Sequence, residues 1–496
     1  MVKKARLYSL IVFILLFLLL PEAAAAIAPP AAEIVPGPLP HLAAVETRPL
    51  AQGVTYRRLA GTNGAGQPLV GHLVEVDGKD RSLELRPVLA GDRLGKAETV
   101  SALASRYGAL AAVNGGFFAR GDGLTMPVGN VVIDGRLLAA SDFWRTSFGL
   151  TRQKKVLYGF FAPQPVFKVA GSGTLIPVGN LNRPYRPDRT NLYQAVWGER
   201  SGTPPGTREL ILLPRDGRYL VTGSGQGNSP IPPAGMVLAG DPAVLPDLAP
   251  GTVLTFDPGW DPAWQGVHHL LTGGPLLVEG GRPVFQAVQE GFSGTVLGRR
   301  ARTAIGVREN GNLLLVVVEG GEEQESGVTL EEMAVLLGEL GAATAVGLDG
   351  GGSSAMWVAG QLVSRPATGT ERPVANALVV LRQIPVYLDG WRLPCDVPPA
   401  LVGGRVLVPL RAIFQGLDAT VHWDEATREI TAQRGERQIR LTVGEKTASV
   451  GGRPVKLDVP AQVVDGRTLV PVRFVSQALG AAVEWRAAER EVHIFR

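Results

Sequence analysis

Three apolar runs in this sequence end at one polar residue that is followed by paired glycines. The polar residues are Asn114 in Ala-Val-Asn-Gly-Gly-Phe-Phe, Thr272 in Leu-Leu-Thr-Gly-Gly-Pro and Asp349 in Gly-Leu-Asp-Gly-Gly-Gly-Ser-Ser. Each pattern predicts a buried strand that ends in a glycine loop, because glycine accepts φ > 0 and lets the backbone approach a ligand closely. Successive N–H groups in such loops form anion-binding nests. We therefore expect the three loops to share one site for an anionic group.

A fourth apolar run, residues 313–318, ends at Glu319-Gly320-Gly321 and adds a carboxylate to the same kind of strand exit. None of these loops is a nucleotide phosphate loop. The Gly-Lys-Ser/Thr ending that such a loop requires is absent after Asp349. The loops therefore indicate an anion site of another kind.

A helix, a glycine and a strand are expected in that order before both Asn114 and Asp349. In the second unit, Thr329 and Glu332 have the spacing of a capping box, and apolar residues follow at i, i+3, i+4 and i+7. The repeated unit predicts an α+β fold with a mixed sheet, in which Asn114 and Asp349 stand at comparable strand ends. Ligands of α/β sheets bind beyond such ends.

Length and composition predict an ordinary folded protein of about two to four domains. The chain has 496 residues, of which 45% are hydrophobic and 19% are charged, and its 63 Gly and 38 Pro favour turns and short strands. The net charge is only +4 and no long basic block follows the N-terminus. We therefore expect no nucleic-acid partner.

The first 26 residues have the pattern of a signal peptide. Lys3, Lys4 and Arg6 precede an apolar stretch, residues 7–20, and three alanines offer a cleavage site. An uncleaved anchor helix is the alternative reading. Residues 27–54 are rich in Ala and Pro and predict an exposed linker. We expect no membrane span after signal cleavage, and the single Cys395 excludes a disulfide framework and a cysteine-based metal site.

The last segment, residues 384–496, contains an internal repeat. Arg405-Val-Leu-Val-Pro-Leu-Arg matches Arg467-Thr-Leu-Val-Pro-Val-Arg at an offset of 62, which is 471 minus 409 for the two prolines. Each copy predicts a strand, a short helix and further strands. The repeat therefore indicates a small duplicated α+β unit.

Residues 55–382 resemble the phosphodiester glycosidase family, which includes the enzyme that removes N-acetylglucosamine from a phosphodiester to uncover mannose 6-phosphate. Five motifs in order carry the resemblance: Asn114-Gly-Gly-Phe-Phe, Pro127-Val-Gly, Thr272-Gly-Gly-Pro, Arg302-Thr-Ala-Ile-Gly and Asp349-Gly-Gly-Gly-Ser-Ser. The chain departs from the family at Glu319-Gly320-Gly321, where Asp-Gly-Arg is common. The carboxylate is kept and the basic residue is missing.

Residues 384–496 resemble the stalk-like N-terminal domain of copper amine oxidases, through the two Leu-Val-Pro repeats. The name does not imply copper here. His422 and His493 stand at non-equivalent points of the repeat and Cys395 is alone, whereas copper sites need several ligands together. We expect a structural or cell-wall attachment role for this segment.

The first resemblance implies hydrolysis of a sugar-1-phosphodiester, whose anomeric carbon develops oxocarbenium character. Carboxylates suit that carbon, and glycine N–H groups with an arginine fork suit the phosphate. The phosphate leaving group is a weak base, so a strong general acid is not required. The candidates for catalysis are Asp349, Glu319 and Asn114. The candidates for binding substrate or phosphate are Arg302, Gly115, Gly116, Thr272, Gly273, Gly274, Gly350, Gly351, Gly352, Ser353 and Ser354.

Plain structural roles compete with several of these assignments. Asn114 and Asp349 are common turn formers, and the two serines can cap or pack. A serine nucleophile would need a base. His268 and His269 precede the Thr272 loop, but we expect a histidine pair in a loop to be solvated. No metal ligand set and no cofactor are predicted, and a divalent cation is left open.

Together these patterns predict a secreted or cell-envelope hydrolase that cleaves a glycosyl-1-phosphodiester in an extracellular or cell-wall glycan. The expected partner is a carbohydrate or sugar-phosphate polymer. One alternative is a glycan-binding cell-envelope protein without catalysis. Another is a metal-dependent phosphodiesterase that cuts at phosphorus.

Overall fold

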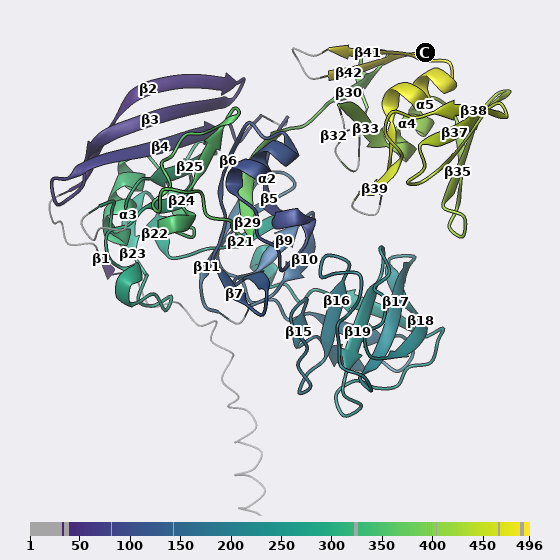
Figure 1. The fold of residues 1–496 in the computed structure, drawn as a ribbon, viewed down its shortest axis with the longest axis horizontal. Helices are drawn as coiled ribbons and strands as arrows, with labels where there is room; N and C mark the ends of the chain where they lie inside the picture. Colours follow the sequence, from purple (N-terminus) through teal and green to yellow (C-terminus); the bar gives the residue numbers. More distant parts are fainter. Residues whose placement is uncertain are drawn as a thin grey trace, which may run out of the picture.

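The computed structural model describes residues 32–33, 39–80, 82–141, 143–321, 326–393, 395, 397, 399–402, 404–464, 467–486 and 491–496. The predicted signal peptide, residues 1–26, lies outside these ranges. Within them, no helix combines the length and the apolar character needed to cross a membrane. Figure 1 shows a main body, an inserted β-domain drawn in teal and a C-terminal part drawn in green and yellow.

The fold is mostly β, with 48% of residues in strands and 10% in helices, so the predicted α+β class was wrong. The two expected helices exist but are short, and almost all strand pairs are antiparallel. The helix–glycine–strand units therefore do not build a mixed sheet with helical layers. The four α-helices of the described ranges are α2 (Val100–Tyr107), α3 (Leu330–Glu339), α4 (Leu410–Gly416) and α5 (Val472–Ala478).

A nine-stranded sheet forms one side of the main body. Its order is β1 (Ala32–Glu33), β23 (Arg282–Phe285), β22 (Leu276–Glu279), β26 (Thr344–Gly347), β24 (Arg302–Val307), β25 (Leu313–Val318), β4 (Pro68–Val76), β3 (Val54–Thr62) and β2 (His41–Ala51). Helix α3 packs on it through Met333, Leu336 and Leu337. Strand β2 comes from the segment expected to be an exposed linker. It is an edge strand whose side chains are mostly exposed.

Two five-stranded sheets complete the main body. One has the order β28 (Gln361–Leu362), β27 (Met356–Val358), β6 (Ala111–Asn114), β29 (Asn376–Arg382) and β5 (Leu83–Leu89). The other has the order β10 (Arg136–Ala139), β9 (Val131–Ile133), β21 (Val267–Thr272), β11 (Thr146–Thr151) and β12 (Val156–Phe160). A hairpin of β7 (Phe118–Gly121) and β8 (Leu124–Pro127) follows β6.

One apolar core joins all three sheets of the main body. It contains Val113 of β6, Leu271 of β21 and Val346 of β26. These strands lead directly to Asn114, Thr272 and Asp349. The shared core therefore brings the three strand exits toward one another, although they belong to three different sheets.

An eight-stranded sheet is inserted between β12 and β21. Its order is β14 (Leu175–Pro177), β13 (Val166–Val169), β20 (Val253–Asp257), β18 (Arg218–Gln226), β17 (Arg208–Arg215), β19 (Met236–Gly240), β16 (Asn191–Gln194) and β15 (Asn180–Leu181). Phe167, Leu210 and Leu238 are fully buried in its core. The sequence of this segment carries no sharp motif, so its sheet was not foreseen.

The C-terminal part has a core of its own and three small sheets. The first has the order β31 (Trp391–Arg392), β30 (Val386–Leu388), β42 (Glu491–Phe495) and β41 (Ala482–Arg486). The second has the order β32 (Ala400–Val402), β33 (Arg405–Pro409), β40 (Arg467–Pro471) and β39 (Gln462–Val464). The third has the order β34 (Thr420–Asp424), β35 (Glu429–Arg434), β36 (Arg437–Thr442), β37 (Thr447–Val450) and β38 (Arg453–Lys456). The two repeat strands, β33 and β40, pair antiparallel, and each leads into a helix.

Candidate active site

Asp349 opens onto a small cavity of about 150 Å³ at the end of β26. The cavity is lined by aromatic rings, glycines and basic side chains around one carboxylate. These include Phe117, Gly274, Phe292, Arg300, Arg302, Leu330, Asp349, Gly350, Gly351, Gly352 and Arg372. Of the predicted site residues, Arg302, Gly274 and the three glycines 350–352 thus lie beside Asp349. The cavity lining does not include Gly115, Gly116, Gly273, Ser353 or Ser354.

Asn114 holds the Asp349 loop in place rather than facing the cavity. Its Nδ2 donates to the Asp349 carbonyl at 2.7 Å, and its Oδ1 accepts from Thr303 Oγ1 at 2.7 Å. Oδ1 also accepts the N–H of Ala355 at 3.2 Å, and the side chain is fully buried. The side-chain amide of Asn114 thus links three segments through its hydrogen bonds. Its predicted catalytic role stays a prediction, and the contacts identify it as a positioning residue.

Burial and neighbouring donors act in opposite directions on the Asp349 carboxyl. Burial raises its pKa to about 6, although Ser353, the N–H of Gly350 and the guanidinium groups of Arg372 and Arg145 lower it. The Gly350 N–H donates to Asp349 Oδ1 at 2.8 Å. A carboxyl group with such a pKa is largely ionised at neutral pH and still has appreciable basicity.

Arg302 at the start of β24 and Arg372 in the segment before β29 both line the cavity and differ in burial. Arg302 is buried, and its guanidinium donates to the carbonyls of Val328 at 3.1 Å and Val296 at 2.7 Å. Burial, and next to it the charge of nearby Arg300, lowers its pKa to about 10. Arg372 is exposed and packs on Gly352, where an added Cβ would lie 2.2 Å from its Nη2.

Arg145 was not foreseen as a site residue. Its guanidinium carbon lies 4.3 Å from the ring centre of Phe292 and 4.9 Å from that of Phe117, and both rings line the cavity. Burial lowers the pKa of Arg145, although Glu290 and Asp349 raise it. In the sequence, Arg145 follows the aromatic pair Phe143-Trp144, which forms no recognisable motif. Nothing nearby in the sequence linked it to Asp349.

Buried donors around these loops that have no hydrogen-bond partner within the described residues include Arg145 Nε, Ser354 Oγ and Asn376 Nδ2. Asn376 contacts the Asn114 loop, since its Oδ1 accepts the N–H of Gly116 at 2.9 Å. Buried donors are normally paired with protein or water. Of these three residues, Arg145 also interacts with Asp349 through its charge, so its Nε is an unused donor beside the carboxylate.

Most of the glycine N–H groups that were predicted to bind phosphate already donate hydrogen bonds to other groups of the protein. Those of Gly115 and Gly116 donate to Asn376, and that of Gly273 donates to the Thr146 carbonyl. Gly274 donates to the Gly347 carbonyl, Gly350 to Asp349 and Gly351 to the Ala301 carbonyl. Their role in binding phosphate stays a prediction. At Gly115 the packing requires the absence of a side chain, since a Cβ there would lie 1.9 Å from Asn376 Oδ1.

Thr272 and Glu319 do not line the cavity. Thr272 Oγ1 accepts the N–H of Asn130 at 3.0 Å and shares a hydrogen bond with Ser147 Oγ at 2.7 Å, which joins two strands. Glu319 Oε1 is 2.9 Å from His72 Nε2 and accepts the N–H of Arg365 at 2.8 Å. Burial raises the pKa of Glu319, but these hydrogen bonds outweigh it and the pKa falls below its usual range. Its catalytic role stays a prediction.

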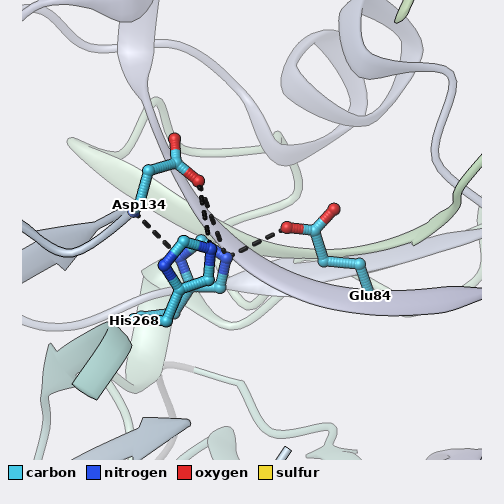
Figure 2. Close-up of side chains that lie close together, drawn as sticks. Glu84, Asp134 and His268 are labelled. Atoms are coloured by element: carbon cyan, nitrogen blue, oxygen red, sulfur yellow. Dashed lines mark hydrogen bonds and ion pairs between the residues drawn. The ribbon is translucent and has the colours of Figure 1, made fainter. Parts of the chain in front are cut away.

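His268 and His269 were expected in a solvated loop but lie in strand β21. His269 is buried, and its Nε2 is 3.0 Å from Glu84 Oε1. Figure 2 shows this cluster with Glu84 and Asp134. Neither histidine lines the Asp349 cavity.

Two family models match this chain. Residues 215–381 match the model described as phosphodiester glycosidase, which covers Thr272, Arg302 and Asp349. The resemblance to the phosphodiester glycosidase family is confirmed over these residues, and the Asn114 and Pro127 motifs lie before the matched range. Residues 387–494 match the model described as copper amine oxidase N-terminal domain, which confirms the second resemblance.

Individual relatives of this phosphodiester glycosidase-like chain are distant. Over 82 residues it is 37% identical to the SPbeta prophage-derived uncharacterized protein YomE of Bacillus subtilis strain 168, which is 16% of this chain and 13% of YomE. A hypothetical protein from Synechocystis superposes with a TM-score of 0.57 at 27% identity, over 69% of this chain and 64% of that chain. The chain thus spans less than two thirds of either relative.

A further solved structure, from Burkholderia pseudomallei K96243, superposes with a TM-score of 0.56 at 24% identity. The alignment covers 71% of this chain and all of that chain. At this identity the likeness concerns the fold alone.

Proposed function

We propose that the protein is a secreted phosphodiester glycosidase that hydrolyses the bond between a sugar C1 and the phosphate oxygen in an extracellular or cell-wall glycan. The observation that carries this proposal is one carboxylate, Asp349, in a small cavity whose walls present Arg302 and Arg372. A sugar-1-phosphodiester offers a developing positive charge at C1 and a fixed negative charge at phosphorus. The site offers the opposite charge to each.

Asp349 is the group that we assign to the anomeric side. As a carboxylate it can attack C1 or activate water there, and it stabilises oxocarbenium character. Asn114 fixes the loop of Asp349 by donating a hydrogen bond to the Asp349 carbonyl. The phosphomonoester that leaves has a second pKa near 6, so departure needs little protonation and a second carboxyl group close by is not required.

The guanidinium groups are assigned to the phosphate. Arg302 and Arg372 line the cavity directly, and Arg145 is stacked on the two rings that form its wall. The exposed Arg372 can present its guanidinium fork to phosphate oxygens in a planar, bidentate way. Arg302 already donates to backbone carbonyls through Nε and Nη2, which leaves Nη1 for the phosphate. The unpartnered Arg145 Nε would gain an acceptor when a phosphate enters.

The competing function is binding of a glycan without turnover. The observation that favours it is Glu319-Gly320-Gly321, where the family often has Asp-Gly-Arg, together with the position of Glu319 outside the cavity lining. In that case the arginines would hold a phosphorylated glycan and Asp349 would serve packing.

Turnover of a panel of sugar-1-phosphodiesters by the purified protein separates the two functions. A glycosidase releases free sugar and a phosphomonoester, and Asp349→Asn abolishes release while binding persists. Binding without products from the unaltered protein would favour the glycan-binding function. Release of sugar 1-phosphate and a free alcohol would contradict glycosidase chemistry.

A further inference from the structure

Four potential metal ligands from three separate strand regions meet outside the Asp349 cavity. Glu84 lies near the start of β5, Asp134 lies in the turn between β9 and β10, and His268 and His269 lie in β21. One ligand atom from each residue lies within 4.8 Å of those of the other three. Figure 2 shows the imidazole rings side by side and facing the two carboxylates.

The two histidines converge only because β21 is irregular at this point. Consecutive side chains of a regular strand point to opposite faces of the sheet. Here the pairing with β11 shifts register, because Leu150 faces His269 while Thr151 faces Val267. The two imidazole centres are consequently 4.4 Å apart. Bulges of this kind re-aim side chains and are frequent next to functional sites.

The ligand atoms are close, shielded from bulk water and still reachable. His269 Nε2 is 3.0 Å from Glu84 Oε1, and Asp134 Oδ1 is 3.6 Å from His268 Nε2. The four side chains are between 5% and 19% exposed. All four line a cavity of about 620 Å³, which gives an ion a path to the ligands.

Arg86 forms ion pairs with both carboxylates of the cluster. Its two Nη atoms donate to both oxygens of Asp134, at 2.8 and 2.5 Å, and it lies 3.8 Å from Glu84. It balances one of the two carboxylate charges, so the cluster keeps one negative charge when both imidazoles are neutral. Carboxylates that bind metals are commonly held by such outer hydrogen bonds, and each oxygen has a second lone pair to offer.

We propose that Glu84, Asp134, His268 and His269 form a binding site for a divalent transition-metal ion, of which Zn²⁺ suits the ligand set best. Imidazole nitrogens and carboxylate oxygens are ordinary zinc ligands. The N–H of Asp134 points at His269 Nδ1 at 3.4 Å, which places the ring proton on Nε2. Coordination through Nε2 moves that proton to Nδ1 and gives up this long contact.

The site would act as a clamp between two sheets. Glu84 belongs to the sheet of β5, whereas Asp134 and the histidines belong to the sheet of β9 and β21. An ion that binds the folded chain and not the unfolded chain raises stability by mass action. The proposal is independent of the glycosidase function, because none of the four residues lines the Asp349 cavity.

The test uses the full chain, treated with EDTA and then titrated with Zn²⁺ alone. We expect about one zinc per chain by elemental analysis, a higher Tm with zinc, and recovery of the lower Tm with EDTA. His268→Ala and Glu84→Gln should each lower zinc affinity by about tenfold or more. His422→Ala, an exposed histidine of β34, is the matched control and should bind zinc like the parent chain.

Glu84→Gln keeps the size of the side chain, so a loss of zinc affinity in this variant is not caused by a loss of fold. A parent chain that takes up no zinc at micromolar concentration and keeps its Tm would overturn the proposal. Zinc uptake that His268→Ala and Glu84→Gln leave unchanged would overturn it as well, because the ion would then bind elsewhere.

Discussion

At the scale of single residues, Asp349 is governed by two opposing effects. Burial at the end of β26 disfavours its charge, and Arg372 and Arg145 favour it. The balance places its pKa at about 6. The protonation state of one side chain should therefore set the lower pH limit of activity.

We predict that kcat/KM falls below pH 6. The pKa is raised, so Asp349 is ionised above about 6 and becomes protonated below it. A protonated carboxyl group can neither attack C1 nor accept a proton, and the rate should drop about tenfold for each pH unit. A pH–rate profile between 4.5 and 8 measures this. A flat profile would remove Asp349 from the chemistry.

Arg145 should matter for phosphate and not for the sugar. Arg145→Ala should lower kcat/KM for a sugar-1-phosphodiester by about tenfold to a hundredfold, the cost of a lost charged hydrogen bond. Arg215→Ala, at an exposed arginine of the inserted sheet, is the control and should change little. Equal losses for a neutral aryl glycoside would mean that Arg145 supports the fold instead.

Residue identity could be predicted from sequence only where the signal is local. The polar–glycine–glycine pattern pointed to Asp349, which does open onto a cavity. Arg145 lies 204 positions before Asp349 (349 minus 145), and only the folded chain brings its guanidinium near that carboxylate, stacked on Phe117 and Phe292. No pattern within one segment contains that information.

At the scale of elements, the strand exits were largely predictable and the sheets were not. β6 ends at Asn114, β21 ends at Thr272, and the capping box of Thr329 and Glu332 begins α3 as expected. These features depend on residues a few positions apart. Sheet membership depends on pairing between distant strands, and the three exits proved to belong to three sheets.

The glycine loop after β26 should tolerate little side-chain volume beside Arg372. A Cβ on Gly352 would lie 2.2 Å from Arg372 Nη2, so Gly352→Ala should push the flexible guanidinium away and leave the backbone intact. We expect KM for a phosphodiester to rise about fivefold, which is about 1 kcal/mol, with little change in Tm.

Gly121→Ala is the matched control for this loop, because a Cβ at Gly121 meets no atom within 4 Å. Steady-state kinetics and thermal melting of both variants measure the difference. Unchanged kinetics in Gly352→Ala would show that Arg372 does not take part in binding.

At the scale of the whole molecule, the main body and the C-terminal part have separate cores. Ile384, Val408 and Phe414 belong to the C-terminal core, whereas the residues that join the three sheets belong to another. Each core can stabilise its own part, as is usual for domains. The Asp349 cavity draws no residue from beyond position 372.

Deletion of residues 384–496 should therefore leave turnover nearly intact. We expect kcat/KM of the shortened chain to stay within about twofold of the full chain, since the cavity and its core lie before the cut. Retention on isolated cell walls should fall, if the C-terminal part attaches the protein there. Loss of turnover in a folded, shortened chain would show that the C-terminal part completes the site.

The central claim is cleavage of the bond between C1 and oxygen, with Asp349 at the anomeric carbon. The most direct measurement is hydrolysis of a sugar-1-phosphodiester in water enriched in ¹⁸O, followed by mass spectrometry of both products. Cleavage at C1 predicts ¹⁸O at C1 of the free sugar and none in the phosphomonoester. Label in a phosphate product would place the cleavage at phosphorus and contradict a role of Asp349 at the anomeric carbon.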